Sequence, residues 1–129
     1  MSKLKVISSK NAPSAIGTYS QAIKAGDFIY ISGQIPLDPK NMELVSEDFK
    51  DQINQVLANL NAIVTEAGCQ LSDVIKLNVY LKDLTDFQSV NDQMSKMFSK
   101  PYPARAAIEV SRLPKDVLVE MDAVVYIGD

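Results

Sequence analysis

The sequence contains no histidine and no tryptophan, and its single cysteine is Cys69. Without histidine, the chain cannot build a Ser-His-Asp or Cys-His catalytic site, or the common histidine-containing zinc sites. A single cysteine excludes an intrachain disulfide, a CxxC redox motif and an all-cysteine zinc site, and it agrees with a reducing compartment. The five glycines are scattered, and neither a Walker loop nor a GxGxxG motif is present to bind nucleotide phosphates.

Strong positive charge and long apolar runs are also missing. The net charge is -3, and lysine and arginine are nowhere denser than in residues 112–115, so nucleic acid is weakly supported as a partner. No apolar run approaches the ~20 residues of a membrane helix, and residues 1–6 lack the apolar core of a secretion signal. We therefore expect a cytoplasmic protein without a membrane partner, folded as one domain over residues 1–129.

The apolar periodicity predicts an α+β domain. Period-two patterns indicate strands, and apolar stripes at spacings of three and four indicate two helices. We expect strands at 3–7, 19–24, 28–32, 73–82, 103–110 and 117–127, and helices at 48–67 and 85–99, the second opened by a Thr85-x-x-Gln88 capping box. The repeated order of strand, helix and strand fits a sheet with both helices on one face.

The last two strands each have one wholly apolar row, which we expect to face the core. These rows consist of Ala104, Ala106, Ile108 and Val110, and of Val117, Val119, Met121, Ala123, Val125 and Ile127. The opposite rows carry Arg105, Glu109, Glu120 and Asp122. Because two helices cover only one side of a sheet, this mixed face predicts a subunit interface.

The short segment 111–116 suggests that these two strands form a hairpin. Symmetric pairing would set Arg105 opposite Asp122 and Ala107 opposite Glu120, so that Arg105 and Glu120 become diagonal neighbours on one face. An arginine fork grips a carboxylate, and a free glutamate beside it orients a water molecule or moves a proton. Alternatively, Arg105 forms a purely structural ion pair with Glu120 or Asp122.

Other candidate residues each have a structural interpretation beside the functional one. Asn91 lies in the apolar stripe of the second helix, where it either satisfies a backbone group or lines a pocket. Gly33 follows Ser32 at the end of a strand, and it is either a turn glycine or a point where a ligand approaches the backbone. Tyr19 is expected to be a surface or rim aromatic, and Cys69, which has no basic neighbour, is expected to be inert.

Several of these residues belong to motifs that resemble a known family. The motifs are AIGTYSQA at 15–22, SGQIP at 32–36, residues 83–91, PAR at 103–105 and RLPKD at 112–116, followed by Glu120. Together they resemble the Rid (reactive intermediate deaminase) family, also called YjgF or L-PSP. The resemblance covers essentially the whole chain, with the motifs in matching order and at matching separations.

The resemblance implies a chorismate-mutase-like (ferredoxin-like) fold with a six-stranded mixed sheet and two helices on one face. It also implies a homotrimer in which the sheets form an inner barrel and ligand sites lie in clefts between subunits. The implied activity is hydrolysis of reactive 2-imino or enamine acids, 2-iminobutanoate and 2-iminopropanoate, to 2-keto acids and ammonia. The implied partner is therefore a small imino or keto acid, and the reaction needs no metal or organic cofactor.

The resemblance also implies roles for individual residues. Arg105 would clamp the substrate carboxylate with help from the backbone amide of Ala107, and Glu120 would orient the attacking water. The residues that would line the cleft, some of them from the neighbouring subunit, are Tyr19, Ser32, Gly33 and Asn91.

The chain departs from the family pattern at three positions. Ala107 replaces a common cysteine, Thr18 a common proline, and Met94 a frequent aromatic residue, while Arg105 and Glu120 are intact. These departures bear on the substrate range. Two alternative functions remain: a non-enzymatic trimer that binds small carboxylates as a regulator or chaperone-like partner, and an endoribonuclease or translation inhibitor. The acidic composition makes RNA cleavage the less attractive of the two.

Overall fold

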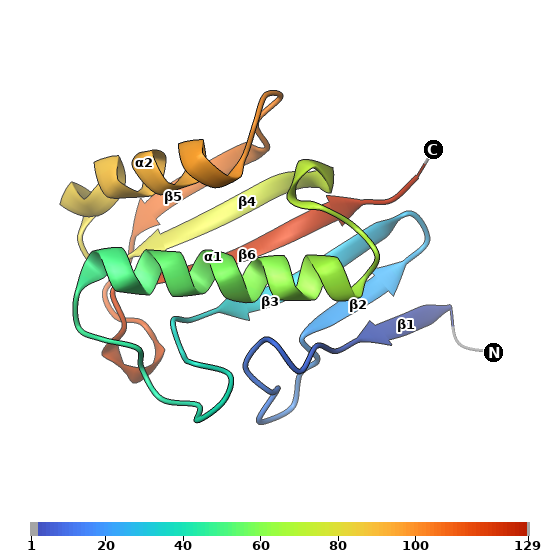
Figure 1. Cartoon of the computed structure of the whole chain (residues 1–129), viewed down its shortest axis with the longest axis horizontal. Coiled ribbons are helices and arrows are strands. Elements are labelled where there is room, and N and C mark those ends of the chain that lie inside the picture. The colour runs from blue at the N-terminus through green and yellow to red at the C-terminus, as the bar shows by residue number, and fades with distance from the viewer. Residues whose placement is uncertain (1–2, 129) are drawn as a thin grey trace.

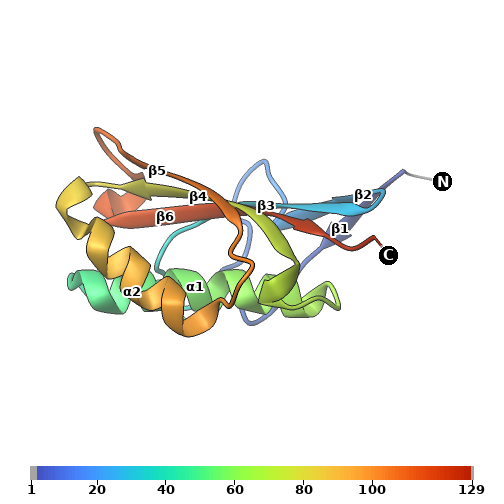
Figure 2. The same ribbon diagram turned by 90° about the horizontal axis from the view of Figure 1, so that it is seen from above.

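The computed structural model describes residues 3–128, so both ends of the expected domain 1–129 lie outside the described residues. Its elements are β1 (Leu4–Ile7), β2 (Ala22–Ala25), β3 (Phe28–Gln34), α1 (Phe49–Glu66), β4 (Val74–Leu81), α2 (Phe87–Met97), β5 (Ala104–Glu109) and β6 (Val119–Tyr126). The strands form one six-stranded mixed sheet in the order β1-β2-β3-β6-β4-β5. Both helices lie on the same side of it (Figures 1 and 2), which confirms the α+β prediction.

The predicted hairpin between the last two strands is wrong. β5 pairs in parallel with β4, whereas β6 lies between β3 and β4 and is antiparallel to both. The segment between them crosses the end of β4, where Val110 N donates to Leu81 O and Lys82 N donates to Leu118 O. The strongly apolar β6 takes a central position in the sheet, and the alanine-rich β5 is left at its edge. Alternation along a strand fixes its two faces but does not identify its neighbours.

The face predicted for β5 is also wrong. Arg105 pairs with Leu77, and Ala106 pairs with Asn78. Because paired residues share a face, Arg105 points to the side that carries the helices, together with the fully buried Leu77. The row of Ala104, Ala106 and Ile108, which we had expected in the core, lies instead on the opposite side and is exposed.

The core lies between the helices and the sheet. From α1 it takes Ile53, Val56, Leu57, Leu60, Ile63 and Val64, all 2 % exposed or less, and from β6 it takes Val119, Met121, Ala123 and Val125. Asp48 caps α1 by accepting from Asp51 N, so the predicted helix 48–67 is correct to within a residue at each end. The predicted capping box is wrong, because the Thr85 hydroxyl donates to Asp83 and α2 begins two residues later.

The other side of the sheet, called the open face below, combines apolar and ionic groups. Val6, Tyr30 and Ile108, on three different strands, are exposed there by 61, 53 and 50 %. At its centre, Asp122 accepts hydrogen bonds from Asn78 Nδ2 at 2.7 Å and from Tyr80 Oη at 2.8 Å. Within residues 3–128, neither helix is both long and apolar enough to cross a bilayer.

Candidate functional site

Glu120, near the start of β6, projects into a pocket of about 450 Å³. This glutamate pocket is lined by Pro13, Ser14, Ile16, Tyr19, Ser32, Gly33, Gln34, Ile35, Leu37, Met42, Pro114, Lys115 and Glu120. It therefore gathers four residues that the sequence analysis selected, namely Tyr19, Ser32, Gly33 and Glu120. Most of the remaining lining is apolar, so the Glu120 carboxylate lies at the wall of a largely apolar hollow.

Buried hydrogen bonds hold the wall of this pocket. The Ser32 hydroxyl donates to Ser20 O at 2.6 Å, and the buried Gln21 side chain accepts from Ser9 N and donates to Pro13 O. These bonds fasten the loop that carries Tyr19 to β3. Ser32 therefore contributes to the pocket by fixing its wall, since its hydroxyl proton already has a backbone acceptor.

Electrostatics distinguish Glu120 from an ordinary surface carboxyl. Burial, and secondarily the charge of Asp122 two residues away, raise the pKa of Glu120 above its usual value. Asp122 also raises the pKa of Tyr80 to about 12, mainly because the phenol donates a hydrogen bond to it. A half-buried acid with a raised pKa in a pocket is typical of a group that exchanges protons during a reaction.

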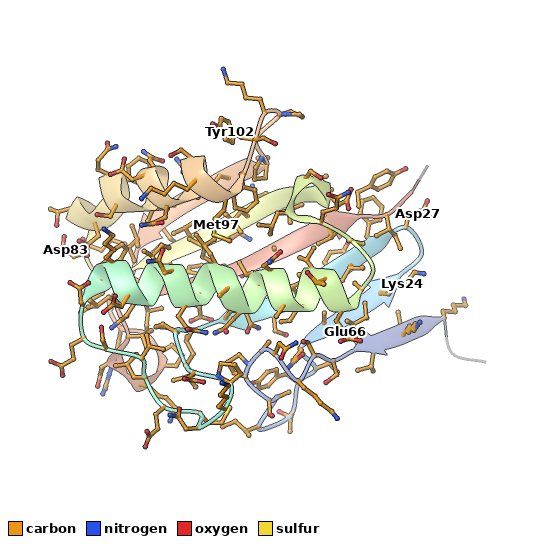
Figure 3. The ribbon with its side chains drawn as sticks, viewed as in Figure 1. Lys24, Asp27, Glu66, Asp83, Met97 and Tyr102 are labelled. Atoms are coloured by element: carbon orange, nitrogen blue, oxygen red, sulfur yellow. The ribbon has the colours of Figure 1, made fainter. Side chains whose placement is uncertain are left out.

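Arg105 lines a second pocket of about 440 Å³, formed with Asn91, Met94, Ser95, Tyr102 and Pro103 and called the arginine pocket below. Its Nη1 donates to Asn91 Oδ1 at 2.7 Å, and its guanidinium carbon lies 4.9 Å from the centre of the Phe87 ring. Tyr102, which is 50 % exposed, lies beside the start of β5 (Figure 3). The structure thus places Asn91 at a pocket and in contact with Arg105.

The ion-pair interpretation of Arg105 is wrong. Across residues 3–128 the salt bridge present is Arg112–Asp116, so neither Glu120 nor Asp122 neutralises Arg105 within this part of the chain. The guanidinium is instead oriented by an amide oxygen and an aromatic ring, which leave its positive charge available to an anion. Ala107, two residues along β5, lies on the same face as Arg105, where it pairs with Val79.

The two pockets do not meet within one chain. Arg105 pairs with Leu77 on the helix side, whereas Glu120 pairs with Tyr80 on the open face. Two strand spacings, about 10 Å, and three residues of strand length, about another 10 Å, separate their backbones. The predicted contact between Arg105 and Glu120 on one face is therefore wrong, and one chain alone holds two separate half-sites.

Sequence reasoning missed several residues of these pockets. Phe87 beneath Arg105 was assigned only to an apolar helix stripe, and the pocket residues Met42 and Lys115 were not selected. Both Met42 and Lys115 have left-handed backbones, with φ of 62° and 56°. Such conformations are uncommon for residues other than glycine and often occur at functional sites. Methionine and lysine do not favour this conformation, so no signal in the sequence predicts it.

Comparisons with known proteins agree on one family. A family model described as Endoribonuclease L-PSP matches residues 9–127. A RutC family protein of Pyrococcus horikoshii is 57 % identical over 122 residues, which cover 95 % of this chain and 97 % of the relative. A 2-iminobutanoate/2-iminopropanoate deaminase of Salmonella typhimurium is 45 % identical over 123 residues, with coverage of 93 and 95 %. The crystal structure of RidA from an Antarctic Psychrobacter is 50 % identical, with a TM-score of 0.92 and coverage of 95 and 99 %.

Proposed function

Because the chain belongs to the Rid (YjgF, L-PSP) family, we propose that it hydrolyses reactive 2-imino acids, such as 2-iminobutanoate and 2-iminopropanoate, to 2-keto acids and ammonia. The observation that carries this proposal is an arginine that Asn91 and Phe87 orient at a pocket and that no acid among residues 3–128 neutralises. Such a guanidinium suits the carboxylate of the substrate. The deaminase name of the Salmonella relative supports the reaction.

The complete site forms between two copies of the chain. The arginine pocket is lined by residues of α2 and of the edge strand β5, and the glutamate pocket is lined by Glu120, whose side chain lies on the open face of the same sheet. Contact between the edge of one copy and the open face of the next joins an arginine pocket to a glutamate pocket. This contact uses different surfaces on the two partners, and such contacts form a closed ring when the rotation between copies closes. We propose that this ring is a homotrimer.

The chemistry follows from the two half-sites. Arg105 holds the substrate carboxylate and thereby fixes the adjacent C=N carbon, which is electrophilic when its nitrogen is protonated. Glu120 accepts a proton from water as the water oxygen bonds to that carbon. It then returns the proton to the nitrogen. As the C–N bond breaks and ammonia leaves, the hydroxyl derived from the water gives its proton to Glu120 and becomes the carbonyl oxygen, and this proton passes to the departing ammonia. Orientation of the water and the imine supplies most of the acceleration.

A coupled assay tests this function. Adding the protein to a threonine dehydratase reaction should accelerate release of the keto acid, and Arg105→Ala should lower kcat/KM by about 100-fold, because a charged hydrogen-bonding clamp is lost. Arg112→Ala is the matched control, since Arg112 is exposed and paired only with Asp116. Absence of acceleration by the wild-type protein at matched concentration would contradict the proposal.

Mixing two impaired variants tests whether the site lies between subunits. Arg105→Ala and Glu120→Gln should each lose activity by about 100-fold when assayed alone. Dissociated and reassembled together in equal amounts, they should regain about a quarter of the wild-type sites, because some interfaces join an intact Arg105 to an intact Glu120. If both residues served one site within a single chain, the mixture would be no more active than the two variants assayed alone.

The description of the family model makes RNA cleavage the second candidate. A salt-titrated RNA-binding and cleavage assay separates the two functions, since binding to phosphates weakens steeply with salt. Cleavage that persists in Arg105→Ala and Glu120→Gln would assign it to another surface or to a contaminant. Binding of small carboxylates without turnover would instead support a regulatory trimer.

A further inference from the structure

Gly33 lies in an irregular part of β3, directly beside Glu120. Ile31 pairs with Ala123 and Gln34 pairs with Met121, so three steps along β3 correspond to two steps along β6. Ser32 and Gly33 together therefore oppose the single residue Asp122, which is the pattern of a β-bulge. Bulges redirect side chains and often lie next to active sites.

The missing side chain of Gly33 leaves room for the Glu120 carboxylate. A Cβ built on Gly33 would overlap Glu120 Oε2 and lie 3.0 Å from Cδ and 3.4 Å from Cγ. The φ angle of Gly33 lies outside the left-handed region, so its backbone conformation is open to other residues. Glycine is therefore needed at this position because it leaves space for the carboxylate, and not because of its backbone freedom.

Nothing else on the described chain fixes this carboxylate by hydrogen bonding. Among residues 3–128, the Glu120 carboxylate accepts no hydrogen bond, although Asp122 beside it accepts two. The fixed charge of Asp122 repels the Glu120 carboxylate. The charge of Asp122 on one side and the free space beside Gly33 on the other thus determine where the Glu120 carboxylate lies.

We propose that Gly33 is a positioning residue for the hydrolysis: its bare Cα provides the space in which the Glu120 carboxylate is seated and aimed at the attacking water. This inference rests on the proposed function. It assigns to Gly33 a role through Glu120, distinct from the backbone contact with a ligand that the sequence suggested. The atoms that a Cβ at position 33 would overlap lie at the end of the flexible Glu120 side chain. An added methyl group therefore displaces the carboxylate and leaves the fold intact.

Kinetics of Gly33→Ala test the inference. We expect kcat for 2-iminobutanoate to fall about 10- to 100-fold, as for a small misplacement of a reacting group, with KM changed less than threefold because Arg105 still binds the substrate. Melting temperature and native mass should match the wild type. In a Glu120→Gln background, Gly33→Ala should cause no further loss. Wild-type kcat in Gly33→Ala, or an equal loss in both backgrounds, would overturn the proposal.

A shortened acid provides a rescue experiment. Aspartate at position 120 is one methylene shorter and withdraws from an alanine Cβ at position 33. The double variant Gly33→Ala/Glu120→Asp should therefore be at least about threefold more active than the product of the two single effects predicts. If the loss of activity in the double variant equals the product of the two single losses, direct contact between positions 33 and 120 would be contradicted.

A titration of the Glu120 carboxyl carbon by NMR tests the inference without any turnover. The ionisable groups around Glu120 are Asp122, Tyr80, Tyr19 and Lys115, and all four are unchanged in Gly33→Ala. Displacement of the carboxylate toward water should lower the pKa of Glu120 toward its ordinary value. An unchanged titration would overturn the role of Gly33. An inactive wild-type protein with the expected titration change would overturn only the deaminase function.

Discussion

Asp122 contributes to the raised pKa of Glu120, the residue that we expect to activate water. It lies two residues from Glu120 on β6, and Asn78 and Tyr80 hold its carboxylate in place. Burial is the larger cause of the raised pKa of Glu120, and the charge of Asp122 is the second. Glu120 must be deprotonated to accept a proton from water, so activity should fall as pH drops through this raised value.

Replacing Asp122 with asparagine should shift the acid limb of the kcat/KM profile to lower pH. The neutral side chain removes the like charge, but burial remains, so the limb should stay above the ordinary glutamate range. Asp116→Asn is the matched control, because Asp116 is exposed and pairs with Arg112. A limb that stays in place, or moves to higher pH, in Asp122→Asn would rule out this coupling.

Among the structural elements, α1 supports the glutamate pocket through one buried amide. Asn59 is fully buried, and its Nδ2 donates to Ile35 O and Leu37 O at 3.1 Å each. Ile35 and Leu37 both line the glutamate pocket. The helix thus fixes the loop after β3 as well as contributing to the core.

Asn59→Ala should lower the free energy of unfolding by about 1–3 kcal/mol, because Leu37 O loses a buried donor and Ile35 O keeps only its bond from Leu37 N. Asn61→Ala, at an exposed position of the same helix, should change it by less than about 0.5 kcal/mol. Urea unfolding curves measure both effects. Since alanine is the better helix former, helix propensity cannot explain a loss, and equal changes in the two variants would rule out a special contribution from the hydrogen bonds of Asn59.

Sequence patterns predicted the elements far better than their neighbours. The stripe of α1 is long and regular, so its ends were predicted to within a residue. Glu120 and Arg105, both selected from the sequence, each line a pocket. The crossover of β5 to β6 was not predictable, because both a hairpin and a crossover satisfy the same alternation. The face of β5 was misassigned because its small alanines suit either side of an edge strand.

On the scale of the whole molecule, the open face should be the surface through which copies associate. Tyr30→Glu places a charge among its exposed apolar side chains and should yield a monomer by native mass measurement. Deaminase activity should be lost although Arg105 and Glu120 are intact. Thr65→Glu adds the same charge on the exposed side of α1 and should leave assembly and activity unchanged. A fully active Tyr30→Glu monomer would refute the shared site.

The separation of Arg105 and Glu120 by β4 has a practical consequence for measurement. If a single copy of the chain is inactive by itself, the rate per milligram of protein depends on the protein concentration. Specific activity should decline on dilution below the dissociation constant of the assembly and recover on concentration. Assays of this protein at trace amounts would then underestimate its turnover, and a dilution series would show the shortfall.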